Sequence, residues 1–176
     1  MSDRLVGICQ APAETRESEQ SGVVSSEPGA YPGSPIQMDV KRITPEEAKS
    51  LLDSGDGYVY LDVRTVEEFN AGHVPGAKNI PFIDRMGPNP HFVEIVEKNF
   101  SKDARLICGC QHARRSLMAA QVLKNAGFTN VVDMRGGFEG EMDHCGCLVM
   151  PGWALQGLPT STESTPEDQY ESLKSR

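Results

Sequence analysis

Cys110 stands between an apolar run and two arginines, a setting in which its sulfur could act as a nucleophile. Residues 105–108 precede it, and Arg114 and Arg115 follow it. A cysteine attacks as its thiolate, and beside cationic groups or a helix N-terminus the pKa of a cysteine falls from about 8.5 to between about 3.5 and 7.5. We therefore predict that Cys110 is a reactive thiol in a loop suited to an anionic donor.

The residues on either side of Cys110 predict the elements that position it. Residues 105–108 are typical of a buried strand, and residues 114–126 have apolar side chains at helical spacing. Gly127 stands where a left-handed residue ends a helix. The backbone N–H groups of the loop should converge on one point, and the helix N-terminus adds about half a positive charge. Both effects favour a thiolate at Cys110.

Strands and helices alternate along the middle of the chain. Residues 44–47 and 65–68 each form a capping box that should begin a helix. Further apolar patterns predict a helix at residues 91–100 and strands at residues 58–61, 78–80 and 131–134. This alternation predicts an α/β domain with a mainly parallel sheet. Cys110 would then lie at the carboxyl end of a strand, where such folds bind ligands.

The two ends of the chain differ in composition from its middle. Residues 1–35 and 160–176 are rich in small and polar residues and lack apolar periodicity. Such segments bury too little apolar surface to offset the entropy of ordering. We therefore expect a disordered N-terminal arm at residues 1–35, one domain at residues 36–159 and a disordered C-terminal tail at residues 160–176.

The composition restricts the class of protein. The chain has 17 basic and 25 acidic residues and a net charge of −8, which argues against a broad nucleic-acid-binding surface. It contains no apolar run of the about 18 residues that a membrane span needs. Its first residues do not resemble a secretory signal, and its five cysteines do not suggest a secreted disulfide framework. We expect free thiols, a cytoplasmic location, and no nucleic-acid or membrane partner.

Several motifs resemble those of rhodaneses. Residues 110–116, Cys-Gln-His-Ala-Arg-Arg-Ser, are similar to the family's active-site loop, Cys-x-x-Gly-x-Arg-Ser. The other similar segments are residues 61–69 and 72–77, which resemble the family's first signature, and residues 126–131, 136–138 and 157–159. The chain is identified as a member of this family over about residues 40–159. The resemblance implies the rhodanese-like three-layer fold, a mainly parallel central sheet flanked by helices.

The resemblance also implies an activity, that of a thiosulfate sulfurtransferase. Cys110 would attack the outer sulfur of thiosulfate or of a persulfide donor, and the Cys110 persulfide would pass that sulfur to cyanide, a thiol or a protein. Covalent catalysis of this kind needs no metal or organic cofactor. The residues expected to bind the anionic donor or to shape its pocket are Gln111, His112, Ala113, Arg114, Arg115, Ser116 and Arg64.

Two features depart from the family pattern. Ala113 occupies the place of the usual loop glycine, and if that position needs a positive φ, its Cβ costs energy and could shift the loop amides. Residues 139–153 are longer than the usual connection and contain His144, Cys145 and Cys147. One hypothesis is that Cys145 or Cys147 resolves the Cys110 persulfide or forms a regulatory disulfide.

Other interpretations stay open. One is a non-catalytic persulfide carrier or redox sensor that serves a dedicated partner. Another is a phosphatase or arsenate reductase, because Cys108 and Arg114 have the Cys-x5-Arg spacing, although this would place the nucleophile inside a strand. A third is a tetrahedral zinc site. Its candidate ligands are Cys108, Cys110, His112, His144, Cys145 and Cys147.

Some polar residues are expected to be structural. Cys108 should be a small core residue of its strand, and His73 should support a turn. Asp62 and Arg64 should form a pair that fixes the adjoining loop. The physiological donor and acceptor and the oligomeric state are not indicated by the residue types.

Overall fold

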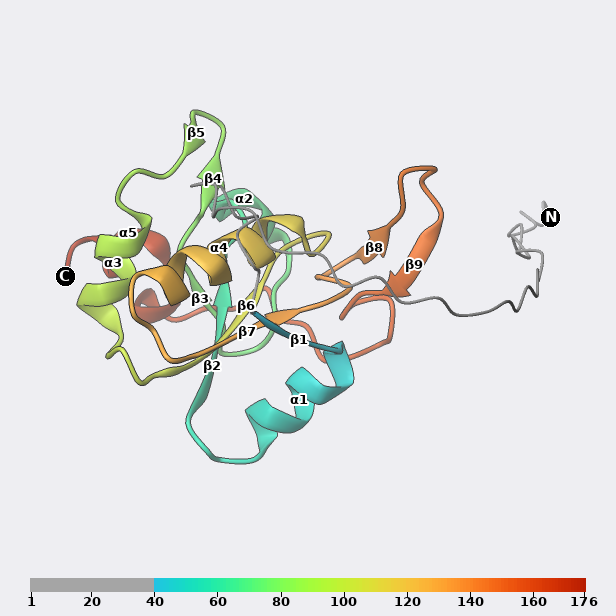
Figure 1. The fold of residues 1–176 in the computed structure, drawn as a ribbon, viewed down its shortest axis with the longest axis horizontal. Helices are drawn as coiled ribbons and strands as arrows, with labels where there is room; N and C mark the ends of the chain where they lie inside the picture. The colour runs from blue at the N-terminus through green and yellow to red at the C-terminus, as the bar shows by residue number, and fades with distance from the viewer. Residues whose placement is uncertain (1–39) are drawn as a thin grey trace, which may run out of the picture. The chain divides into compact units, whose positions relative to one another are not determined.

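Five parallel strands form the central sheet of the part that the computed structural model describes, residues 40–176 (Figure 1). The predicted arm at residues 1–35 lies outside the described residues. The order across the sheet is β1-β7-β6-β2-β3. The strands are β1 (Lys41–Ile43), β2 (Tyr58–Asp62), β3 (Lys78–Asn79), β6 (Arg105–Gly109) and β7 (Asn130–Met134).

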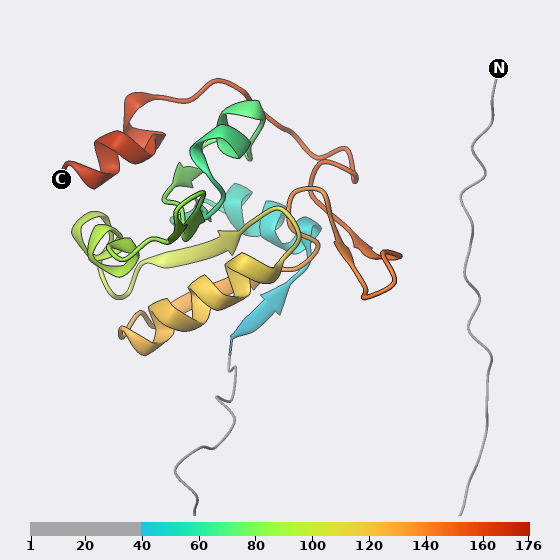
Figure 2. The same cartoon turned by 90° about the horizontal axis from the view of Figure 1, so that it is seen from above.

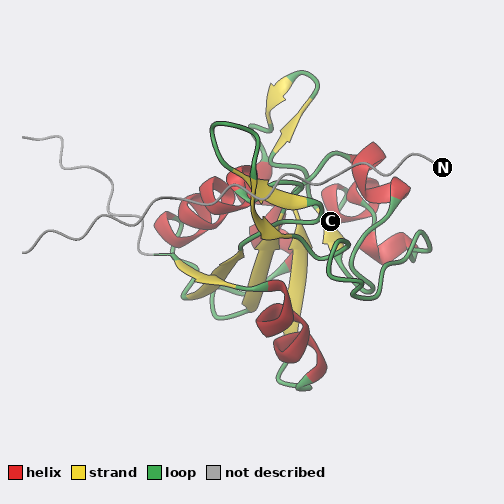
Figure 3. Ribbon diagram, turned by 90° about the vertical axis from the view of Figure 1, so that its right-hand side faces the viewer, coloured by secondary structure: helices red, strands yellow, loops and turns green. Residues whose placement is uncertain are grey.

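Helices cover both faces of the sheet, so that it is the middle of three layers (Figure 2). On one side lies α1 (Pro45–Asp53), and on the other lie α3 (Phe92–Asn99) and α4 (Arg114–Asn125). Figure 3 shows the strands between these helices. Side chains alternate along each strand: Leu106 belongs to the α3–α4 core and Ile107 to the α1 core. The predicted α/β architecture is confirmed.

The two predicted capping boxes begin α1 and α2 (Val66–Ala71). Thr65 accepts a hydrogen bond from the Glu68 backbone at 3.2 Å, and the Glu68 carboxylate accepts one from the Thr65 backbone at 2.9 Å. Thr44 and Glu47 make the same reciprocal pair. Between residues 40 and 176, no helix is long and apolar enough to cross a membrane.

Several short strands were not predicted from the sequence. They are the edge strand β1 and the hairpins β4–β5 (Ile83–Asp84, Gly87–Pro88) and β8–β9 (Gly140–Met142, Leu148–Pro151). Both hairpins project from the domain in Figure 1. Strands of two to four residues are too short to show a period of two, so their pairing depends on partners that are remote in the sequence or held by a turn.

The prediction of a disordered tail at residues 160–176 is wrong. This segment contains a 3₁₀ turn, η1 (Pro166–Asp168), and the helix α5 (Tyr170–Lys174). Leu173 is buried in the α3–α4 core, and the Lys78 ammonium donates to the Asp168 carboxylate at 2.6 Å. The domain therefore extends beyond residue 159. The composition of residues 160–176 gave the wrong prediction because the apolar contacts of this segment are with α3 and the sheet, not within the segment.

Candidate active site

Cys110 lies where β6 ends and α4 is about to begin. Its side chain is only 1% exposed. Gly109, just before it, pairs with Asp62 at the carboxyl end of β2. A Cβ at Gly109 would lie 1.8 Å from the Tyr60 hydroxyl oxygen, so only glycine fits there. The expected position of Cys110, at the carboxyl end of a central parallel strand, is confirmed.

Ser116 is the polar side chain that meets the sulfur. The Cys110 thiol donates to Ser116 Oγ at 3.3 Å, and Ser116 is fully buried in the first turn of α4. A hydroxyl in this place can also turn and donate to a thiolate. Together with the positive end of α4, it provides two means of stabilising negative charge on the sulfur.

Ala113 has a positive φ, the backbone conformation that is costly for a residue with a Cβ. Its φ is 60° and its ψ is 9°, and within residues 40–176 it is the one residue other than glycine with a positive φ. A Cβ in the left-handed region costs about 1–2 kcal/mol. Because α4 begins at the next residue, the turn at Ala113 sets the direction in which the helix leaves the loop.

A second chain segment supports the loop from outside. The Phe138 and Glu139 amides donate to the Cys110 and Gln111 carbonyls at 2.8 and 3.0 Å. The C=O and N–H groups of a trans peptide are antiparallel, so the N–H groups of Gln111 and His112 point away from this segment. A Cβ at Gly137 would lie 2.5 Å from the Gln111 carbonyl oxygen, which explains the glycine.

Arg115 forms a two-pronged ion pair with Glu68 on α2. Its Nη1 and Nη2 donate to Oε2 and Oε1 at 2.8 and 2.6 Å. Burial acts to raise the pKa of Glu68, but hydrogen bonds from Arg115 and Thr65 outweigh it and lower that pKa. The sequence analysis treated Glu68 only as a helix cap, because nothing in the linear order indicates that α2 faces α4.

Arg64 lies beneath the loop and is 2% exposed. Its Nη2 donates to Asp62 at 2.7 Å, which confirms the predicted pair, and its Nη1 donates to the Gln111 side chain at 2.9 Å. The guanidinium also stacks on the Phe138 ring, 4.3 Å from its centroid. Arg64 thus joins the end of β2 to the loop that holds Cys110.

Arg114 and His112 lie at the exposed rim. Arg114 is exposed and has no ion pair with any residue in the range 40–176. His112 Nδ1 is 2.8 Å from the Gly140 carbonyl, at the base of the β8–β9 hairpin. Of the cations that were expected to bind an anion, Arg114 is therefore the one most open to a ligand in solution.

Cys108 is buried in β6, as predicted. Burial, and then the negative charges of Asp133 and Cys110, raise its pKa well above that of an ordinary thiol. This environment disfavours the phosphatase hypothesis, in which Cys108 would be the thiolate. His73 is also structural, as expected: it is buried and stacks on Phe69, with ring centroids 3.9 Å apart.

Cys145 and Cys147 lie in the turn of the β8–β9 hairpin, and both are exposed. The Asp143 carboxylate accepts from both of their amides at 2.8 Å. Among residues 40–176, no three His, Cys, Asp or Glu side chains lie close enough together to hold a metal ion. The six candidate zinc ligands therefore do not assemble in the described part of the chain.

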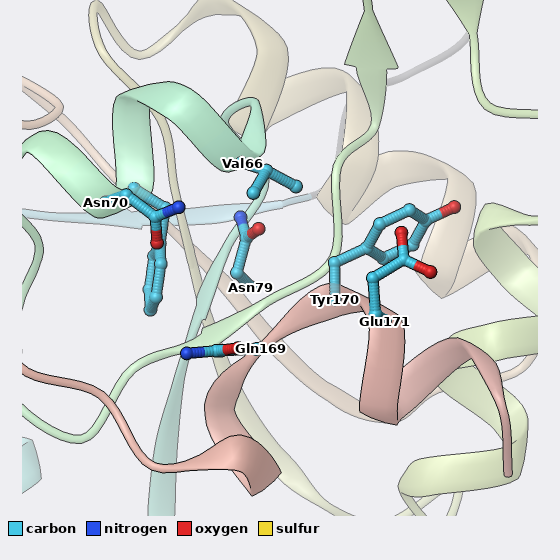
Figure 4. Close-up of a pocket in the computed structure, with 7 residues that line it drawn as sticks. Val66, Asn70, Asn79, Gln169, Tyr170 and Glu171 are labelled. Atoms are coloured by element: carbon cyan, nitrogen blue, oxygen red, sulfur yellow. The ribbon is translucent and has the colours of Figure 1, made fainter.

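Figure 4 shows a small cavity of about 50 Å³, and Cys110 is not among the residues that line it. Asn79 on β3 is one of its walls, and the C-terminal residues Gln169 and Tyr170 are others. The Asn79 amide donates to the backbone carbonyls of Asp62 and Arg64 at 3.1 and 3.0 Å. Asn79 thus lies between this cavity and the turn that carries Arg64.

Solved structures and curated relatives resemble this chain. A crystal structure of Rv0390 from M. tuberculosis matches 70% of the chain and 98% of that protein, with a TM-score of 0.55 at 24% identity. This match shows the fold. The family model for the rhodanese-like domain matches residues 44–142, more than half of the chain. The chain belongs to the rhodanese-like family.

Relatives within the rhodanese-like family are closer in sequence. Thiosulfate sulfurtransferase 16, chloroplastic, of Arabidopsis thaliana is 43% identical over 108 residues, which cover 59% of this chain and 80% of that protein. Thiosulfate sulfurtransferase GlpE of Pseudomonas entomophila is 35% identical over 101 residues, 57% of this chain and 84% of that protein. Rhodanese-like domain-containing protein 15, chloroplastic, of Arabidopsis thaliana is 43% identical over 86 residues, but the chain spans only 47% of its length.

Proposed function

We propose that this rhodanese-like protein is a thiosulfate sulfurtransferase that carries sulfur as a persulfide on Cys110. The Cys110 thiolate attacks the outer sulfur of thiosulfate, the S–S bond of thiosulfate breaks, and sulfite leaves with the electron pair. An acceptor then attacks the outer sulfur of the persulfide, and the Cys110 thiolate is released. The observation that carries this proposal is the position of Cys110 between the end of β6 and the N-terminus of α4, in contact with Ser116.

The residues around Cys110 would have different roles in this reaction. The N–H groups of Gln111 and His112, which point away from the supporting segment, would donate to the persulfide sulfur. Arg114 would attract the anionic donor. Arg115 would act through Glu68, holding α2 against the start of α4, and Arg64 would keep the loop in place through Gln111.

The partners follow from this chemistry. The donor is a small anion with a sulfane sulfur, and the acceptor is cyanide, a thiol or a protein thiol. The cytoplasmic location stays a prediction, since two of the plant relatives are named chloroplastic.

The direct test is intact-protein mass spectrometry after incubation with thiosulfate. We expect the native chain to gain about 32 Da, one sulfur atom, and Cys110→Ser to gain nothing. Turnover of thiosulfate and cyanide should fall at least about a thousandfold in Cys110→Ser, because the nucleophile is lost. Cys108→Ser is the matched control and should keep the added sulfur. A gain that persists in Cys110→Ser would contradict the proposal.

The low exposure of Cys110 favours one second candidate, a persulfide carrier for a dedicated protein. A carrier would show the added sulfur but little steady-state thiocyanate production from thiosulfate and cyanide. Fast thiocyanate production would eliminate it.

A further inference from the structure

Asn79 carries a buried amide whose oxygen, Oδ1, has no hydrogen-bond partner among residues 40–176. The residue lies on β3 and is 1% exposed. Both hydrogens of its Nδ2 are used, because Nδ2 donates to the Asp62 and Arg64 carbonyls at 3.1 and 3.0 Å. A flipped amide would set its oxygen against these two carbonyl oxygens, so the orientation of the amide is fixed. The unpartnered Oδ1 therefore faces away from the turn that carries Arg64.

The cavity drawn in Figure 4 adjoins this amide. Asn79 is one of its walls, and the other walls come from α2 and from the C-terminal residues 169–171. Phe69 of α2 and Asn79 are each only 1% exposed, so they form the inner wall of the cavity. This inner wall carries no charge, since both side chains are neutral.

The size of the cavity limits what it can bind. Its volume of about 50 Å³ exceeds the roughly 10–15 Å³ that a water molecule needs. The same volume is far below the roughly 300 Å³ of the smaller pockets that bind organic ligands. A neutral molecule of the size of water therefore fits both the volume and the uncharged inner wall.

We propose that this cavity binds an ordered water molecule that donates a hydrogen bond to Asn79 Oδ1. A buried acceptor without a partner is costly, and a bound water removes most of that cost. A buried water makes about three hydrogen bonds, and Asn70 and Gln169, which also line the cavity, have amide groups that can complete them. Gln169 Nε2 donates to Ser164 Oγ at 3.1 Å, which leaves its Oε1 to accept from the water.

The water links three segments that are far apart in the sequence. It joins α2 and the C-terminal residue Gln169 to the amide of Asn79, and this amide holds the turn of Arg64. Arg64 in turn donates to Gln111, the neighbour of Cys110. The water site is separate from Cys110, and the inference does not depend on the proposed function. A failure of sulfur transfer would leave it standing.

The direct test is a high-resolution crystal structure of the native chain. We expect one electron-density peak about 2.7–3.0 Å from Asn79 Oδ1, the ordinary distance for a hydrogen bond between two oxygens. A cavity without such a peak, lined by well-ordered side chains, would overturn the proposal. A peak that is present only in crystals grown from ammonium salts would identify an ammonium ion, and it would overturn the proposal too.

Val66→Ile tests the site in solution, because it adds a methyl group to a side chain that lines the cavity and leaves Asn79 intact. In a dry cavity the extra group would raise the midpoint of thermal unfolding, as cavity filling commonly does. Displacement of a bound water leaves Oδ1 unpartnered, so we expect the midpoint to fall by at least about 3 °C. An unchanged or raised midpoint would contradict the proposal.

Two controls separate loss of the water from overpacking. Val122→Ile adds the same group to a half-buried valine of α4 that does not line the cavity, and it should change the midpoint by less than about 2 °C. In an Asn79→Leu background, which lacks the acceptor, Val66→Ile should no longer lower the midpoint. A fall as large as in the native chain would mean overpacking and would contradict the proposal. If Asn79→Leu does not fold, the crystal structure of the native chain decides.

Discussion

Two pairs of cysteines with the same Cys-x-Cys spacing occupy opposite environments in this molecule. Cys108 and Cys110 are buried at the carboxyl end of β6, whereas Cys145 and Cys147 are exposed in a hairpin turn. Only Cys110 has the N-terminus of a long helix and a buried hydroxyl beside it. The comparison teaches that the spacing of the thiols says little about their chemistry, which depends on the backbone and side chains that surround each sulfur.

The largest expected difference between the two pairs is in accessibility. At pH 8, iodoacetamide should label Cys145 and Cys147 at least about a hundredfold faster than Cys108, because Cys108 is buried and burial raises its pKa. Peptide mass spectrometry at a series of times measures each rate. Raising the pH towards the raised pKa should increase the Cys108 rate, since more thiolate forms. A fast reaction of Cys108 in the folded protein at pH 8 would contradict this expected difference in accessibility.

A smaller effect should follow from relieving the backbone strain at Ala113. Ala113→Gly removes a Cβ from a residue with φ of 60° and should stabilise the protein by about 0.5–1 kcal/mol, after the greater entropy of glycine in the unfolded chain is counted. Urea denaturation measures the change. Ala119→Gly, in the helical part of α4, is the matched control and should be destabilising. If Ala113→Gly is also destabilising, the packing contacts of the Ala113 methyl group contribute more stability than its backbone strain removes.

The smallest effect is expected in the hairpin. Replacing Cys145 and Cys147 together by serine should leave thiosulfate–cyanide turnover within about twofold of native, because both lie in a turn outside the loop that holds Cys110. The same variant tests the resolving hypothesis. If the double variant loses more activity than the native chain after peroxide treatment, one of these thiols protects Cys110. Equal loss in the two proteins would eliminate that role.

The sequence predicted the fold better at its helices and central strands than at its edges. The capping boxes at Thr44 and Thr65 and the strands around Leu61 and Ile107 were predictable because their signals are local. The tail at residues 160–176 was not, because its one buried leucine has its partners in α3 and the sheet. The strands of the two hairpins have only two to four residues, which is too few to show a recognisable pattern.

The sequence by itself predicted the loop that we propose to be reactive, because a cysteine after an apolar strand and before a helix has a local signature. It also identified Ala113 as the residue whose backbone conformation mattered. Only the tertiary structure decided which charges meet that loop: Glu68 faces Arg115, and Arg64 is buried beneath Gln111. Such pairings join residues that are tens of positions apart, and their energies depend on burial and distance, which linear order does not encode.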